Sequence, residues 1–476
     1  MKNNQEKILS FHQYISFKII FLMFSCLVPF FALADNPANE KELYSSSLAP
    51  KINSWETESG VKAMMFQVDS IPVIDIAIDI DAGSRWDPVG LEGLSSMTNS
   101  MIFKGLSKFK NEPHMTEEEI LQFIAKMAMV KSSSNGKDRT SLRFRFLSDD
   151  EIRKPITKFI AHTLSFPEFN EDILEREKNF TISRLEESLT KPQSLATRNL
   201  WKLMYPDHPY GRSISVDSVR SITKNGLKSF HQTFWIPKRM TISIVGDIDI
   251  NDAKKLVNGI TESIPNESIT NDFEHNIEFP LILPAVTKGG SSTKRISHPA
   301  GQSHIWIGLP ILARHETDNI FPMLVANHIL GGSGFGSRLT EEIREKRGLS
   351  YSVFSAFRLL KQEGPFFVAL QTGKNNADVA IQVVSETLRE FIKKGPTTFE
   401  LENAKKGLIG GFALRLDSNF KLLENLSQIA FYDLPLDYLE NWTLRVQAVT
   451  LADVKKVLID KLDLNNLSLV VVGNKD

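Results

Sequence analysis

Arg344 and Tyr351 are the residues of this sequence whose types and spacing best suit the binding of a polar group. They lie seven positions apart, on either side of Gly348. Arginine is permanently charged and tyrosine is a neutral donor below about pH 10, so together they can hold a carbonyl oxygen or an oxyanion. The alternative is a solvated helix arginine near a half-buried strand tyrosine, the ordinary state of such residues.

A glycine loop, a short helix and a strand are expected to position this pair. Residues 331–336 contain four glycines, which permit backbone conformations that other residues avoid. Ser337 is suited to cap the helix that follows, and Gly348 to end it. The strand is expected to begin at Tyr351. The glycine loop itself is open to three interpretations: a hinge, a substrate loop or a turn.

Composition bounds the class of protein. The chain has 476 residues, of which 42% are hydrophobic and 24% charged, with a net charge of −1. These values are typical of globular proteins, and the length is enough for two or more domains. Without bulk positive charge, we expect no nucleic-acid partner.

The N-terminal segment is expected to be an export signal. Residues 1–34 combine three lysines, an apolar run over 19–33 and an A-x-A cleavage signal at 32–34. The only cysteine, Cys26, lies inside this segment, so cleavage would leave no disulfide or thiol chemistry. We therefore expect a periplasmic or otherwise extracytoplasmic protein with no stable membrane insertion after cleavage. An uncleaved anchor is the alternative.

The rest of the chain reads as a duplicated α+β domain. Met240 to Asp247 resembles Leu467 to Asn474, and each similar strand follows an earlier apolar strand at nearly the same distance. The fold class is therefore α+β, with two homologous half-domains, each a mostly antiparallel sheet packed with helices. The predicted boundaries are a signal peptide at 1–34, an N-terminal half-domain at 45–262, a linker at 263–300 and a C-terminal half-domain at 301–476.

Hydrophobic periodicity and turn residues also predict individual elements of this plan. A capping box, Thr116 with Glu119, is expected to open a helix. Other expected elements are strands at 73–82, 141–147 and 351–357, a helix at 90–105, an interruption at 132–136 and a loop at 201–212.

Two motifs make the chain recognisable. The stretch from Ser337 to Val353, Ser-Arg-Leu-x-x-Glu-Ile-Arg-Glu-Lys-Arg-Gly-Leu-Ser-Tyr-Ser-Val, resembles the pitrilysin/insulinase family of zinc peptidases, which includes the mitochondrial processing peptidases. So does the first-half stretch that begins Asp-Ala-Gly-Ser-Arg-Trp-Asp-Pro at Asp81 and continues to Gly105. The resemblance covers nearly the whole chain after the signal segment, with both halves in order.

The family's active members carry an inverted zinc motif, H-x-x-E-H, in the first half. Here the two histidine positions hold Ser96 and Ser100, and the glutamate position holds Asn99. The third ligand position, normally glutamate, matches Arg184. The ten histidines include no other pair three or four residues apart. Since neutral oxygens are weak zinc ligands and arginine repels the ion, we expect no metal and no cofactor in this chain.

In two-chain family members, one chain carries the zinc motif and the other the Arg/Tyr pair that holds the substrate backbone. The resemblance therefore implies a non-catalytic, substrate-positioning subunit of an exported heteromeric zinc metallopeptidase, with Arg344 and Tyr351 acting on the peptide. Its partner would be a homologous subunit that bears the zinc motif. The alternative is a peptide-binding or scaffold protein with no part in hydrolysis. The family's substrate edge strand would fall at four residues, Ser132, Ser133, Ser134 and Asn135.

Overall fold

The fold is built on two sheets, one in each half of the sequence, seen in a computed structural model. The structure describes residues 50–109, 112–266, 277–280, 282–287 and 290–473. The predicted signal peptide, 1–34, lies outside these described residues. Within them, no helix is both long enough and apolar enough to cross a membrane.

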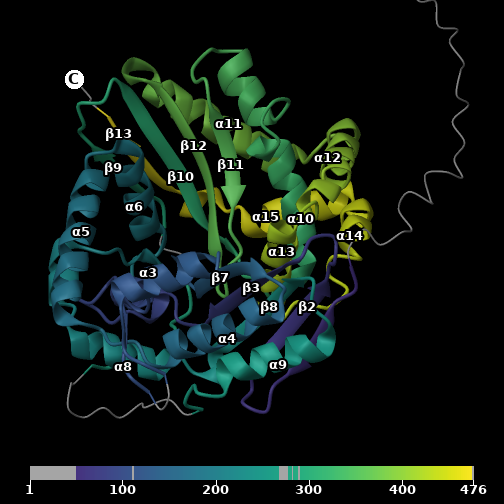
Figure 1. The fold of residues 1–476 in the computed structure, drawn as a ribbon. Coiled ribbons are helices and arrows are strands. Elements are labelled where there is room, and N and C mark those ends of the chain that lie inside the picture. The colour runs from purple at the N-terminus through teal and green to yellow at the C-terminus, as the bar shows by residue number, and fades with distance from the viewer. Residues whose placement is uncertain (1–49, 110–111, 267–276, 281, 288–289, 474–476) are drawn as a thin grey trace, which may run out of the picture. The chain divides into compact units, whose positions relative to one another are not determined.

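The first sheet has six strands in the order β1-β2-β8-β3-β7-β6. Its central strands β3 and β8 are buried on both faces, because helices cover both sides (Figure 1), and one face of each also carries polar side chains such as Asp79 and Ser243. The strands are β1 (Asn53–Glu56), β2 (Lys62–Gln67), β3 (Val73–Ile80), β6 (Val130–Asn135), β7 (Thr140–Leu147) and β8 (Met240–Gly246).

The second sheet has five strands in the order β11-β12-β10-β13-β9. They are β9 (Ser292–Ile296), β10 (Gln302–Leu312), β11 (Val353–Phe357), β12 (Gly364–Gly373) and β13 (Ser468–Val472). This order repeats β6-β7-β3-β8-β2 of the first sheet, and each sheet contains one parallel pair among antiparallel ones. The registers repeat too: Ile78 pairs with Ile242, and Ile307 with Leu469. The predicted α+β fold with two related halves is confirmed.

Helices fill the connections in both halves. In the first half they are α2 (Leu94–Met101), α3 (Glu117–Lys126), α4 (Asp150–Ser165), α5 (Glu171–Leu189), α6 (Pro192–Met204), α7 (Val216–Ser221), α8 (Lys224–Phe234) and α9 (Ile250–Thr261). In the second half they are α10 (Thr317–Asn327), α11 (Ala377–Lys394), α12 (Thr398–Gly410), α13 (Asn419–Phe431), α14 (Trp442–Ala448) and α15 (Leu451–Lys461).

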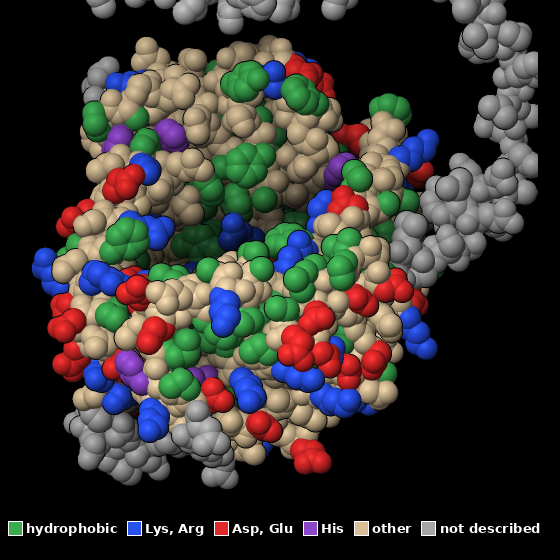
Figure 2. Space-filling model, viewed as in Figure 1, with side chains coloured by type: hydrophobic (Ala, Val, Ile, Leu, Met, Phe, Trp, Pro, Cys, Tyr) green, Lys and Arg blue, Asp and Glu red, His purple; other side chains and the backbone are tan. Residues whose placement is uncertain are grey.

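Each half lends one helix to the sheet of the other half. Helix α13 packs on β8, β3 and β2 of the first sheet, whereas α6 packs on β10 and β13 of the second. The opposite face of the first sheet is covered by α4 and α9 (Figure 1). This exchange explains why the described residues, from position 50 onward, form one compact unit. Figure 2 shows a hollow on the face where the second sheet meets the helices of the first half.

A buried carboxylate ties the two halves together. Asp138 is 2% exposed and accepts hydrogen bonds from Arg85 at 2.6 Å and from the hydroxyl of Tyr210 at 2.6 Å, both in the first half. From the second half it accepts the Lys361 amide at 2.8 Å and the Tyr432 hydroxyl at 3.0 Å. Arg85 belongs to the first-half motif, so this motif serves to join the halves.

Several predicted boundaries are wrong for identifiable reasons. Strand β9 falls inside the predicted linker, 263–300, because its polar sequence shows no apolar alternation and lies beside Gly/Ser turn residues. The predicted interruption at 132–136 is mostly strand β6, whose serines are exposed at the sheet edge. Residues 201–204 of the predicted loop form the last turn of α6. The capping box of Thr116 and Glu119 is confirmed.

Candidate functional site

Arg344 and Tyr351 are brought together by the turn between them. A π-helical turn, Thr340–Glu345, carries Arg344, and Gly348 ends it with φ +60°. Only glycine adopts this conformation without strain, and it turns the chain back toward the helix. The Arg344 Cζ atom then lies 4.5 Å from the centre of the Tyr351 ring. Strand β11 begins two residues after Tyr351, later than predicted.

A second aromatic ring completes this arrangement. Phe335, between two glycines of positive φ, places its ring 4.8 Å from the Arg344 Cζ atom. We call Phe335, Arg344 and Tyr351 the arginine clamp. Its two rings are 75% and 83% exposed. Phe335 was not predicted as a site residue from the sequence. Its position between two glycines at the tip of a loop could have indicated an exposed ring that is available for contact.

The clamp leaves the arginine free to bind a ligand. Among the described residues, no carboxylate pairs with Arg344, whereas its neighbours Lys346 and Arg347 both pair with Glu342. Stacking on aromatic faces engages the plane of the guanidinium and leaves its N–H donors available at the edge. In the clamp, the guanidinium of Arg344 is therefore held in place beside the Tyr351 phenol, and its N–H groups remain available to donate hydrogen bonds.

The three predicted zinc-motif positions of the first half share helix α2. Ser96 is exposed, Asn99 is buried at 5% exposure, and Ser100 donates its hydroxyl to the Met97 carbonyl at 3.0 Å. The Oδ1 atom of Asn99 has no hydrogen-bond partner among the described residues. Asp87 fixes the start of the helix by accepting from backbone N–H groups there. Helix α2 is thus intact, but it presents hydroxyls and an amide.

Zinc does not fit this donor set. The fourth position, Arg184, lies on α5, is exposed and stacks 5.5 Å from the Phe180 ring centre. Zinc requires thiolate, imidazole or carboxylate ligands, and neither serine, asparagine nor arginine supplies one. In the part of the chain that the structure describes, no group of three or more His, Cys, Asp or Glu side chains could hold a metal ion.

The predicted substrate strand lies at a free sheet edge beside α2. Within the described residues, β6 pairs only with β7, so its other side is open. Ser132, Ser133 and Ser134 are exposed, and Asn135 is half-buried. Helix α2 runs against β6, and the Ser95 hydroxyl lies 3.4 Å from the Asn135 side-chain oxygen. The motif helix and the edge strand therefore form one continuous surface.

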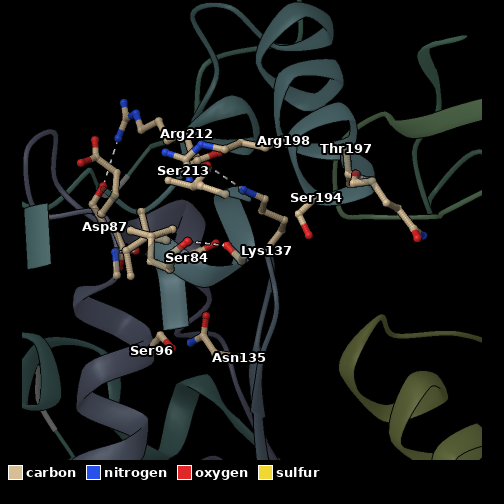
Figure 3. Close-up of a pocket in the computed structure, with 17 residues that line it drawn as sticks. Ser84, Asp87, Ser96, Asn135, Lys137, Ser194, Thr197, Arg198, Arg212 and Ser213 are labelled. Atoms are coloured by element: carbon tan, nitrogen blue, oxygen red, sulfur yellow. Dashed lines mark hydrogen bonds between the residues drawn. The ribbon is translucent and has the colours of Figure 1, made fainter. Parts of the chain in front are cut away.

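A cavity of about 580 Å³ opens where this surface ends. Its walls come from α2, α5, α6, the end of β6 and the loop that follows α6 (Figure 3). Both Ser96 and Asn135 line it, together with three cations: Lys137, Arg198 and Arg212. The sequence analysis did not find these cations, because they are scattered along the chain and only the fold brings them together.

Burial shapes the electrostatics of this cavity. Burial raises the pKa of Asp87 to about 6, although the backbone N–H groups of Gly93 and Ser95 stabilise the carboxylate. Burial also lowers the pKa of Lys137 to about 8; the Asp87 carboxylate opposes this effect in part, whereas the neighbouring Arg198 and Arg212 add to it. Cations are therefore crowded here without full compensation.

Two family comparisons match consecutive parts of the chain. The family described as Insulinase (Peptidase family M16) matches residues 64–218, and the Peptidase M16 inactive domain matches residues 221–408. Together they cover more than half of the sequence. The chain belongs to peptidase family M16.

Relatives of this chain carry mixed descriptions. It is 25% identical to "Uncharacterized zinc protease YmxG" of Bacillus subtilis over 79% of this chain and 87% of that one. It is 24% identical to "Non-peptidase homolog YmxG" of Helicobacter pylori over 74% and 79%.

Solved structures show the same fold. A peptidase M16 inactive domain from Pseudomonas fluorescens superposes with a TM-score of 0.81 at 28% identity, covering 89% of this chain and 98% of that one. A protease from Helicobacter pylori gives a TM-score of 0.78 at 19% identity, covering 89% and 99%.

Proposed function

We propose that this chain is the non-catalytic, substrate-positioning subunit of an exported heteromeric zinc metallopeptidase that cleaves peptides or unfolded polypeptides. The observation that carries the proposal is the arginine clamp, which keeps the guanidinium of Arg344 free in a chain whose zinc positions hold no zinc ligands. The partner is a homologous subunit that bears H-x-x-E-H. Residues 1–34 direct the chain out of the cytoplasm, to the periplasm or an equivalent compartment.

The chemistry divides between the two subunits. The partner supplies the zinc ion, its ligands and the glutamate base, which activate water for attack on the peptide carbonyl. In this chain, Arg344 donates to the substrate backbone near the scissile bond and stays charged at any physiological pH. The Tyr351 hydroxyl adds one neutral donor. Removing one donor of this kind typically costs about 2.7–4 kcal/mol in the transition state.

The open edge of β6 supports an extended substrate. An added peptide strand would satisfy the unpaired backbone groups of β6, which recognises backbone rather than side chains. The exposed serines at positions 132–134 leave room for many substrate side chains. This mode of binding suits an unfolded polypeptide.

The description of the Helicobacter pylori relative as a non-peptidase homologue also supports an inactive subunit. A peptide-binding or scaffold protein is the second candidate, favoured by the fact that the β6 edge could hold a peptide without any hydrolysis. The two functions differ in whether the clamp matters to proteolysis.

The test mixes the chain with its nearest exported homologue that carries H-x-x-E-H and follows peptide hydrolysis. Arg344→Ala and Tyr351→Phe are each expected to lower kcat by about 100-fold or more. Arg389→Ala, which removes an exposed arginine on α11, is the matched control and should retain full activity. Hydrolysis that is unaffected by either clamp variant would favour the scaffold function.

A further inference from the structure

The cationic cavity next to the edge strand has the features of a ligand site. It is lined by Ser96 of the motif helix and by Asn135, the last residue of β6. Lys137 follows two positions later and reaches into the same space. A peptide paired with β6 would therefore pass the mouth of this cavity.

The cations in the cavity are only partly engaged by the protein. Lys137 donates to the Arg212 carbonyl at 3.0 Å, and Arg212 donates to the Asp87 carbonyl at 3.0 Å. Both acceptors are neutral backbone oxygens. Arg198 has neither a hydrogen bond nor an ion pair with any residue that the structure describes, and it is half-buried. Figure 3 shows the ends of Arg198 and Lys137 converging beside Ser213.

The acids of the cavity are directed elsewhere. Both carboxylate oxygens of Asp87 accept backbone N–H groups at the start of α2, at 2.8 Å each. Glu92 accepts the Gly90 amide at 3.2 Å. Neither acid forms an ion pair with Arg198 or Lys137 in the described structure, although the Asp87 carboxylate is close enough to raise the pKa of Lys137 against the effect of burial. A carboxylate brought by a ligand would meet two cations without displacing an existing pair.

Hydroxyl groups complete the surroundings of these cations. Ser194 and Ser213 line the cavity, and neither side chain is hydrogen-bonded within the part of the chain that the structure describes. A half-buried arginine, a lysine and free hydroxyls form a donor set suited to an anion, because charge-assisted hydrogen bonds are the strong ones. The apolar stems and partial enclosure also weaken screening by salt.

We propose that this cavity binds a carboxylate group of the peptide that lies along β6, so that the chain prefers acidic peptides. The proposal rests on the proposed function only for the placement of the peptide. Arg198 and Lys137 hold the carboxylate, and Ser194 and Ser213 donate to it. The site gives side-chain selectivity to a surface that otherwise recognises backbone alone.

The test measures binding by the full chain alone, so it is independent of any zinc partner. Fluorescence anisotropy compares two labelled, C-terminally amidated peptides of alternating valine and serine. The two peptides are identical except at one position, which is Glu in the first and Gln in the second. A third peptide has the Gln sequence with a free C-terminal carboxylate, and inorganic phosphate serves as a competitor. The Glu peptide is expected to bind about tenfold or more tightly than the Gln peptide.

Variants then locate the preference. Arg198→Gln should abolish the difference between the Glu and Gln peptides, and Arg198→Lys should retain part of it. Arg220→Gln, an exposed arginine of α7 outside the cavity, is the control that should keep the full difference. Because Arg198 has no partner in the described structure, its replacement should leave the unfolding midpoint unchanged.

The outcomes separate this inference from the proposed function. Equal binding of the Glu and Gln peptides, no binding of either, or a preference that survives Arg198→Gln would each overturn the carboxylate site while leaving the hydrolysis test open. Preference for the free C-terminus over Glu would assign the carboxylate to the chain end and support the site. If phosphate displaces the peptides but the Glu and Gln peptides bind equally, the carboxylate site is overturned and the cavity is assigned to a small free anion.

Discussion

Replacing Asp138 tests how the two halves of the protein are held together. Asp138→Ala removes an acceptor that serves Arg85, Tyr210, Tyr432 and the Lys361 amide. Arg85 is 1% exposed and would lose one of its two carboxylate partners, keeping its ion pair with Asp81 at 2.7 Å and its stacking on the Trp86 ring. Removing one partner of a buried pair typically costs about 3–5 kcal/mol, because the remaining charge stays buried. We expect a loss in this range.

Tyr432→Phe is the matched control, because it removes one of the four donors and keeps the ring. Its expected cost is about 1 kcal/mol, the typical net value of a single hydrogen bond. Urea unfolding followed by tryptophan fluorescence measures both, using the midpoint of the first transition, since a chain of this size need not unfold in one step. A cost below about 1 kcal/mol for Asp138→Ala, or equal costs for both variants, would refute the network.

Three further predictions follow from the structure. Burial lowers the pKa of His231 to about 4, below about 6.5 in the unfolded chain, so stability should fall by up to about 3 kcal/mol as pH drops from 6.5 to 4. His231→Gln should remove this part of the pH dependence in unfolding titrations; an unchanged slope would contradict it. Phe335→Leu should weaken hydrolysis in the mixture while shifting the unfolding free energy by less than about 0.5 kcal/mol, because the ring is 75% exposed; full activity would show that Arg344 needs no second ring. Neighbouring strand residues point their N–H groups to opposite sides, so of Ser133→Pro and Ser134→Pro one removes an N–H on the open side of β6 and the other an N–H that faces β7. The first should weaken peptide binding without loss of stability, and the second should disturb the hydrogen bonds between β6 and β7. Unchanged peptide binding in both variants would rule out the open edge of β6 as the peptide site.

The duplicated fold could be predicted because its signals are local. Apolar strands at matching distances in the two halves indicated a repeat, and the identical strand orders confirm it. The closeness of Arg344 to Tyr351 followed from a helix, a terminating glycine and a strand that are adjacent in sequence. These features depend on short-range geometry, which a sequence pattern records directly.

The cationic cavity could not be predicted because tertiary packing creates it. Arg198 lies within α6, whereas Lys137 and Arg212 lie in loops, and the three show no common spacing, so the sequence indicates only ordinary surface cations. Strand β9 escaped notice for a related reason: its place beside β13 is determined by the rest of the sheet rather than by its own polar sequence. The sequence of α6 or of α13 likewise does not indicate that each helix packs on the sheet of the other half.

The most direct test of the account measures zinc content and peptide hydrolysis for the full chain, first alone and then mixed with its nearest exported homologue that carries H-x-x-E-H. We predict a zinc-free and inactive chain alone, and hydrolysis in the mixture that exceeds that of the homologue alone. Stoichiometric zinc or hydrolysis by this chain alone would contradict the account, and so would a mixture no more active than the homologue.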